Sequence, residues 1–157
     1  EHPSTLTSLN NLASVLQYQG KYVESETMHR LALEVRRKAL GPEHPETLAS
    51  VNNLANVLQY QGKYDESEAM HRRVLVWGEK ILGPEHPNTL ASINNLASVL
   101  QYQEKYVESE TMNRLALEVR DKVLGPNHPE TLASINNLAS VLQHQGKYKE
   151  SEAMHQR

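Results

Sequence analysis

The sequence predicts an all-α fold, an α-α superhelix in which antiparallel helical hairpins stack as a solenoid. Three observations predict it: a 42-residue internal repeat, two helical patterns inside each repeat, and a composition rich in helix formers. Leu, Ala, Asn, Gln and Glu dominate the 157 residues, and Phe is absent. Few strand-forming residues are therefore available.

The repeat is marked by a Glu-His-Pro string at residues 1–3, 43–45 and 85–87, which becomes Asn-His-Pro at 127–129. The first and third copies differ at only seven of 42 positions. The expected repeat boundaries are 1–42, 43–84, 85–126 and 127–157, with the last copy truncated. We expect one array over residues 1–157, and we interpret it as a fragment of a longer protein because it begins with Glu rather than Met.

Each repeat divides into two helices, as residues 45–84 illustrate. Pro45 suits the first turn of a helix, where its missing N–H has no partner to lose. Apolar residues then recur on one helical face: Leu48, Val51, Leu54, Ala55 and Leu58. Gly62 is placed to end this helix in a left-handed conformation. A second pattern runs from Tyr64 to Ile81, where Leu-Gly-Pro stops it, and the short linker requires antiparallel packing.

Composition excludes several classes of protein. The formal net charge is −3 and nothing in the sequence supplies the basic face of a nucleic-acid binder, so we expect no nucleic-acid partner. There is no Cys, hence no disulfide framework and no thiolate metal site. No apolar run approaches the roughly 18 residues that span a bilayer, so we expect no membrane partner. Together these features predict a cytoplasmic protein.

Residues 53–67 resemble the tetratricopeptide repeat (TPR) signature, with Leu54, Ala55, Leu58, Gly62 and Tyr64 at its spacing. The 42-residue length, with His-Pro at the start and Leu-Gly-Pro at the end, resembles the repeats of kinesin light chains. It resembles still more the C-terminal arrays of fungal and bacterial STAND-type, NLR-like NTPases. The resemblance covers the whole chain and implies a TPR-like solenoid.

The same resemblance implies a non-catalytic module for protein–protein interaction, whose concave groove binds a peptide or a protein surface. We expect the sensor or scaffold array of a larger STAND-type NTPase. Two alternatives stay open. The array could be a scaffold for self-association through its uncapped ends, or it could be a cargo adaptor of the kinesin-light-chain kind.

Repetition disfavours catalysis, because an active site needs a unique constellation and nearly every polar residue here recurs. We find no glycine-rich phosphate loop, nucleophile elbow or His-Glu-x-x-His helix, and we expect no enzyme and no cofactor. The histidines that precede the helices are His2, His44, His86 and His128. We expect them to cap helices, because copies about 10 Å apart cannot share a metal ion. No metal site is expected.

The candidate binding residues form an uncharged stripe on the first helix of each repeat. Amide side chains both donate and accept hydrogen bonds, so a row of them can hold the backbone of an extended peptide. Tyrosines add flat apolar surface with a polar tip. The predicted site is Asn10, Asn52, Asn53, Asn56, Gln59, Tyr60, Asn94, Asn95, Gln101, Tyr102, Asn136 and Asn137. The alternative interpretation is that these asparagines only brace neighbouring repeats.

Overall fold

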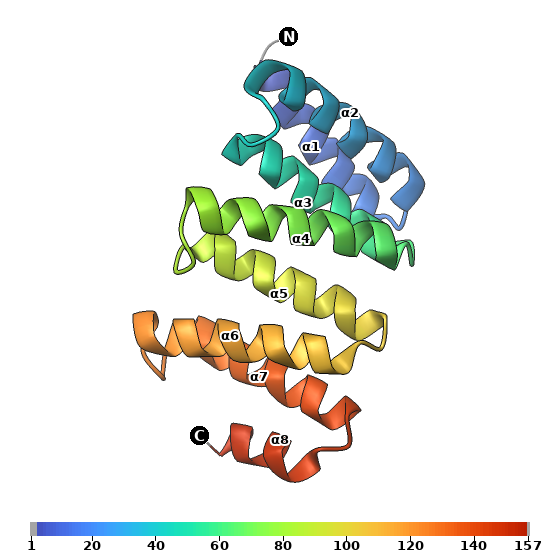
Figure 1. Cartoon of the computed structure of the whole chain (residues 1–157). Coiled ribbons are helices and arrows are strands. Elements are labelled where there is room, and N and C mark those ends of the chain that lie inside the picture. Colours follow the sequence, from blue (N-terminus) through green and yellow to red (C-terminus); the bar gives the residue numbers. More distant parts are fainter. Residues whose placement is uncertain (1–2, 157) are drawn as a thin grey trace. The chain divides into compact units, whose positions relative to one another are not determined.

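The computed structural model describes residues 3–156, and within them every regular element is a helix and none is a strand (Figure 1). The all-α prediction is confirmed. Eight helices follow one another in four hairpins in this part of the chain. They are α1 Pro3–Tyr18, α2 Tyr22–Leu40, α3 Pro45–Tyr60, α4 Tyr64–Ile81, α5 Pro87–Tyr102, α6 Tyr106–Leu124, α7 Pro129–His144 and α8 Tyr148–His155.

Histidine caps explain where three of the first helices begin. His44, His86 and His128 have extended backbone and precede the proline that opens α3, α5 and α7. Each ring Nδ1 accepts a hydrogen bond from the backbone N–H two residues on, at 3.2, 3.1 and 3.2 Å. The cap satisfies an N–H that the helix itself leaves without a partner. The predicted capping role is confirmed for these three, and His2 lies outside the described residues.

The hairpin turn has the left-handed geometry that its glycine predicts. Gly62 has φ +75°. The N–H of Lys63 reaches back to the carbonyl of Leu58 at 2.9 Å, and that of Gly62 to Gln59 at 3.0 Å. This is a Schellman arrangement, which satisfies carbonyls at the end of α3.

The predicted apolar face of the first helix is buried. Leu54, Ala55 and Leu58 have no exposed surface, and Leu48 and Val51 have 6 and 4%. On α4, His71 and Val74 are buried, whereas Ile81 in the last turn is 42% exposed.

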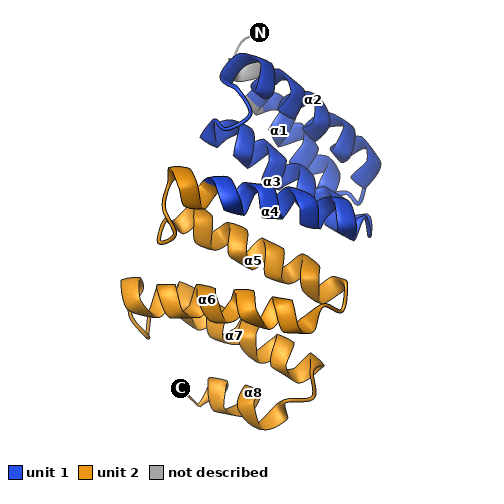
Figure 2. Cartoon of the chain, viewed as in Figure 1, with its two compact units in different colours: residues 1–77 blue, residues 78–157 orange. Residues whose placement is uncertain are grey.

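The helices group into two compact units, residues 1–77 and 78–157 (Figure 2). In the first unit, α2 packs against α1 and α3. In the second, α6 packs against α5 and α7, and α7 against α8. A buried serine ties each hairpin together, since Ser25 Oγ donates to the carbonyl of Ala13 at 2.8 Å and Ser109 Oγ to that of Ala97 at 2.8 Å. Serine rather than alanine at this position thus adds a hydrogen bond to the close contact between the helices.

Candidate protein-interaction face

We call the predicted set of asparagines, glutamines and tyrosines the amide–tyrosine face. In the first unit its members lie on α1 and α3, where Asn10, Asn52, Asn53, Asn56 and Gln59 are half-buried. Tyr60 projects at the end of α3 and is 60% exposed. Half-buried amides beside an exposed aromatic ring offer both polar groups and contact area to a ligand.

In the second unit the corresponding residues lie on α5 and α7. Asn94, Asn95 and Gln101 are half-buried on α5, and Tyr102 is 60% exposed. The two asparagines of α7, Asn136 and Asn137, are exposed. The four repeats therefore present the same residue types with different accessibility.

Some of these amides make contacts that brace the fold. Asn52 Oδ1 lies 3.1 Å from Nδ1 of His71, which joins α3 to α4. With its amide in the orientation that suits its neighbours, Asn10 Oδ1 accepts from Arg36 at 2.8 and 3.1 Å. The bracing role is therefore present at these two positions, whereas ligand binding by the same amides stays a prediction, which the several hydrogen-bonding groups of an amide allow.

Asn94 differs from its counterpart Asn52. Its Oδ1 is buried and has no hydrogen-bond partner among the described residues. The residue that occupies the position of His71 in this repeat is Asn113, which is 3% exposed and whose amide lies 3.5 Å from Ser109 Oγ. Asn113 is shorter than the imidazole that Asn52 contacts, and Asn94 Oδ1 is therefore a buried acceptor without a donor among the described residues.

A cavity of about 310 Å³ opens beside the amide–tyrosine face of the second unit. Gln101, Tyr102, Tyr106 and His144 line it. Tyr106 and His144 stack with ring centroids 5.5 Å apart. In the first unit Tyr22 stacks on a tyrosine, Tyr60, at 5.6 Å. His144 therefore keeps the stacking position while changing the hydrogen-bonding chemistry of the cavity wall.

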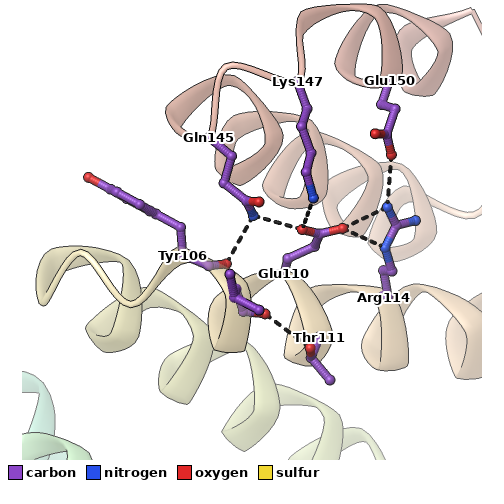
Figure 3. A network of polar contacts seen from close by, with 8 residues as sticks. Tyr106, Glu110, Thr111, Arg114, Gln145, Lys147 and Glu150 are labelled. Carbon is purple, nitrogen blue, oxygen red and sulfur yellow. Dashed lines mark hydrogen bonds and ion pairs between the residues drawn. The ribbon is translucent and has the colours of Figure 1, made fainter.

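Sequence reasoning missed the polar network that joins successive hairpins (Figure 3). Glu110 on α6 accepts from Arg114 at 2.7 Å in the same helix, and also from Gln145 at 2.7 Å and Lys147 at 2.8 Å in the following hairpin. Arg114 in turn contacts Glu150 at 3.2 Å. The sequence feature that could have predicted this network is the recurrence of Gln and Lys 35 and 37 residues after the Glu.

The first unit contains the same network around Glu26, which accepts from Gln61 at 2.9 Å and Lys63 at 2.8 Å. Desolvation raises the pKa of Glu26, but hydrogen bonds from Lys63, Gln61 and Arg30 outweigh it and lower that pKa to about 2. The same balance lowers the pKa of Glu110 to about 2. Both carboxylates are thus ionised in the folded chain. Their lowered pKa values come from contacts that hold neighbouring hairpins together, so we interpret them as structural rather than catalytic residues.

Within residues 3–156, no three or more His, Cys, Asp or Glu side chains come together as a metal-binding group. None of the described helices has the length and apolarity needed to cross a membrane. His29 and His71 are buried packing residues. His155 is exposed, because no described helix packs beyond α8.

Comparison with known proteins identifies the repeat. The chain matches the tetratricopeptide repeat over residues 4–75, 47–105 and 90–157. It belongs to the tetratricopeptide repeat family. The predicted TPR-like solenoid is therefore confirmed, and members of this family generally form non-catalytic interaction modules. No curated protein sequence matches the chain.

Among solved structures, the chain is similar to a protein of Podosopora anserina described as a kinesin light chain with nearly identical TPR-like repeats. The identity is 32%, the match covers 98% of this chain and 73% of that one, and the TM-score is 0.89. A single-substitution variant of that protein gives 30% identity, the same coverage and a TM-score of 0.88. BtubC of P. vanneervenii shares the fold, with 20% identity, a TM-score of 0.85 and coverage of 95% and 59%. The kinesin-light-chain-like character of the repeat is confirmed.

Proposed function

We propose that this TPR array is a non-catalytic protein-interaction module that binds a peptide segment or protein surface on its amide–tyrosine face. The observation that carries the proposal is the recurrence of uncharged amides beside exposed tyrosines. Tyr60 and Tyr102 stand at the same point of successive repeats and are each 60% exposed. A large aromatic ring exposed beside half-buried amides is typical of a contact surface.

The chemistry of the face indicates the kind of ligand. Asn and Gln can pair with both the N–H and the C=O of an extended backbone, so a ligand strand needs no particular charge. None of the residues of the face is Lys or Arg. A ligand held by its terminal carboxylate is therefore disfavoured, since such recognition relies on cationic side chains.

We further propose that the module is the sensor or scaffold array of a larger STAND-type NTPase. This step is supported by the resemblance of the 42-residue repeat to the arrays of those proteins. The sequence of the full reading frame tests it directly. A P-loop domain ahead of the array agrees with the proposal, whereas a heptad coiled coil there favours a cargo adaptor of the kinesin-light-chain kind.

A binding experiment tests the face itself. Peptides selected from a random library on the purified chain would be titrated against Asn52→Ala/Asn94→Ala. Binding should weaken by about 1–3 kcal/mol, the cost of leaving polar partners without hydrogen bonds. The control is Thr27→Ala/Thr111→Ala, which changes two exposed residues of α2 and α6. If the asparagine variant loses as much folding stability as binding energy, the amides brace the fold and the proposal fails.

A specific observation also favours self-association as a second function. Leu12 and Val15 of α1 are 49 and 50% exposed, whereas Leu54 and Val57 at the same positions of α3 are fully buried. Leu12 and Val15 are therefore exposed apolar side chains of the kind that pack between hairpins elsewhere in the chain. Light scattering should show association of this chain at high concentration, and Leu12→Lys should reduce it. A monomer at about millimolar concentration would contradict this function.

A further inference from the structure

A pocket away from the amide–tyrosine face occurs twice in the chain. In the first unit it has a volume of about 500 Å³ and lies where α2 meets α3. In the second unit it has about 460 Å³ and lies where α6 meets α7. Leu33 and Leu54 line the first, and Leu117 and Leu138 stand at the same positions in the second. We call them the α2–α3 pocket and the α6–α7 pocket.

The charged residues that line the α2–α3 pocket are not equally engaged. Arg30 contacts Glu66 at 2.7 Å and also Glu26, and Lys38 contacts Glu34 at 2.6 Å. The side chain of Arg37 is exposed and forms no hydrogen bond or ion pair with another described side chain. Arg37 is therefore the cation of this pocket that has no counter-ion among the described residues.

The α6–α7 pocket lacks that cation. Asp121 stands at the position of Arg37, one of the seven differences between the first and third repeats. The other charged positions keep their sign, with Arg114, Glu118 and Lys122 in place of Arg30, Glu34 and Lys38. The first pocket is thus lined by three cations and one anion, the second by two of each. The two pockets are therefore similar in size and in apolar lining, but they carry opposite charges at the position of Arg37 and Asp121.

We propose that the α2–α3 pocket binds an acidic, leucine-bearing segment of another protein and that the α6–α7 pocket does not. A ligand leucine would cover the apolar surface of Leu33 and Pro42, above the fully buried Leu54. A carboxylate beside it would accept hydrogen bonds from the planar guanidinium of Arg37, which can pair with both oxygens at once. The same segment would place its carboxylate against Asp121 in the second pocket, where like charges repel.

This site differs from the amide–tyrosine face in position and in ligand. Its charged residues all lie on α2, the second helix of the hairpin, whereas the face lies on first helices. The face contains no charged residue, so it offers nothing to distinguish an acidic segment from its amide analogue. The proposal therefore stands or falls independently of the function proposed above.

The test uses the whole chain and a blocked Glu-Leu-Glu-Leu peptide, titrated by calorimetry and by backbone amide NMR spectra. We expect one site, with shifted signals from α2 around Leu33. Arg37→Asp should weaken binding about tenfold, since it turns attraction into repulsion, and Arg37→Gln should have a smaller effect. The reciprocal change, Asp121→Arg, should raise the stoichiometry from one to two. The blocked Gln-Leu-Gln-Leu peptide should bind the unaltered chain about tenfold more weakly.

Folding does not limit the test, because aspartate occurs naturally at this position in the third repeat, and urea midpoints would be compared for every variant. Four results would overturn the proposal. These are unchanged affinity in Arg37→Asp, equal affinity for the Glu and Gln peptides, a stoichiometry of one in Asp121→Arg, and no binding at millimolar peptide. Weaker binding in Asn52→Ala, with Arg37→Asp unaffected, would instead place the peptide on the amide–tyrosine face and also refute the proposal.

Discussion

Arg120 donates a hydrogen bond to Ser134 Oγ at 2.7 Å and thereby links α6 to the hairpin that follows. The Nε of Arg120 lies 3.3 Å from a carboxylate oxygen of Glu130, and Arg120 is only 4% exposed. Arg36 has the same arrangement in the first unit, with Ser50 and Glu46. A buried guanidinium needs such partners, because an unpaired charge in the interior is costly.

Both members of this ion pair are replaced where the second repeat meets the third. Gly78 occupies the position of the arginine, and Asn88 occupies that of the glutamate. A Cβ at Gly78 would lie 3.2 Å from Thr89 Oγ1, so a longer side chain there has little room. Ser92, the counterpart of Ser134, donates to the carbonyl of Asn88 instead. Among the described residues, the ion pair therefore links the first repeat to the second and the third repeat to the fourth.

The first prediction concerns this ion pair. Arg120→Ala should lower the free energy of unfolding by about 2 kcal/mol, because a buried hydrogen bond and the packing of the arginine stem are both lost. Glu130→Gln should cost less than about 1 kcal/mol, since the carboxylate is more than half exposed. Urea titration at equal slope measures both. Equal losses in the two variants would show that the ion pair, not the packing, dominates.

The second prediction uses the buried acceptor of Asn94. Asn113→His places in the third repeat the imidazole that lies 3.1 Å from Asn52 in the second. The new ring should contact Asn94 Oδ1 and raise the free energy of unfolding by about 1 kcal/mol. Histidine is accommodated with 0 to 2% exposure at this position in the first and second repeats, so space should suffice.

The control for that variant is Asn113→His combined with Asn94→Ala, in which the partner is absent. The gain should vanish in this double variant, and the double-mutant cycle isolates the contact itself. An equal gain with and without Asn94 would mean that the imidazole stabilises α6 by packing alone. No gain in either would mean that the third repeat is packed differently from the second.

The third prediction is a pH dependence that comes from buried histidines. Desolvation lowers the pKa of His71 to about 4, and it also lowers that of His29. The unfolded chain takes up a proton near pH 6.5, whereas folded His71 stays neutral down to about pH 4. The free energy of unfolding is therefore unaffected by His71 protonation above pH 6.5. It falls as the pH decreases toward 4, by up to about 3 kcal/mol for His71.

His29→Asn/His71→Asn should flatten this dependence, and urea titrations between pH 7 and pH 4.5 would measure it. Glu26 and Glu110 act in a lower range, because their lowered pKa values of about 2 make their contribution disappear only below pH 4.5. The two effects are thus separable by pH. A double variant whose stability still falls steeply from pH 6.5 to 4.5 would refute the assignment to these histidines.

The sequence predicts the helices and their ends, but it does not predict which side chains of neighbouring helices are in contact. Pro45, His44 and Gly62 act within one turn of their own position, so local rules predicted the helix ends. The contact of Glu110 with Lys147 joins residues 37 apart, and periodicity does not say which side chains of the next repeat are reached. For the candidate site, the pattern predicted the residue types of the face. It could not show that Asn52 has a histidine partner while Asn94 has none.

The last prediction concerns the turn where the third repeat departs from glycine. Glu104 has φ +60°, close to the +74° and +75° of Gly20 and Gly62 at the same position. The turn also keeps its hydrogen bonds, with Lys105 N–H reaching the carbonyl of Leu100 at 2.9 Å and Glu104 N–H that of Gln101 at 3.0 Å. The chain has therefore kept the left-handed geometry and accepted the strain of a Cβ, rather than relaxing into another turn.

Glu104→Gly should relieve that strain and raise the free energy of unfolding by up to about 1 kcal/mol, because the greater entropy of glycine in the unfolded chain offsets part of the roughly 1–2 kcal/mol gain. The matched reverse variant, Gly62→Glu, places the same side chain in the second repeat, where no atom lies within 4 Å of the added Cβ. It should destabilise by a similar amount through strain alone. Urea titrations at equal slope compare the two. A lower midpoint for Glu104→Gly would show that the glutamate side chain stabilises this turn by more than its backbone strain costs.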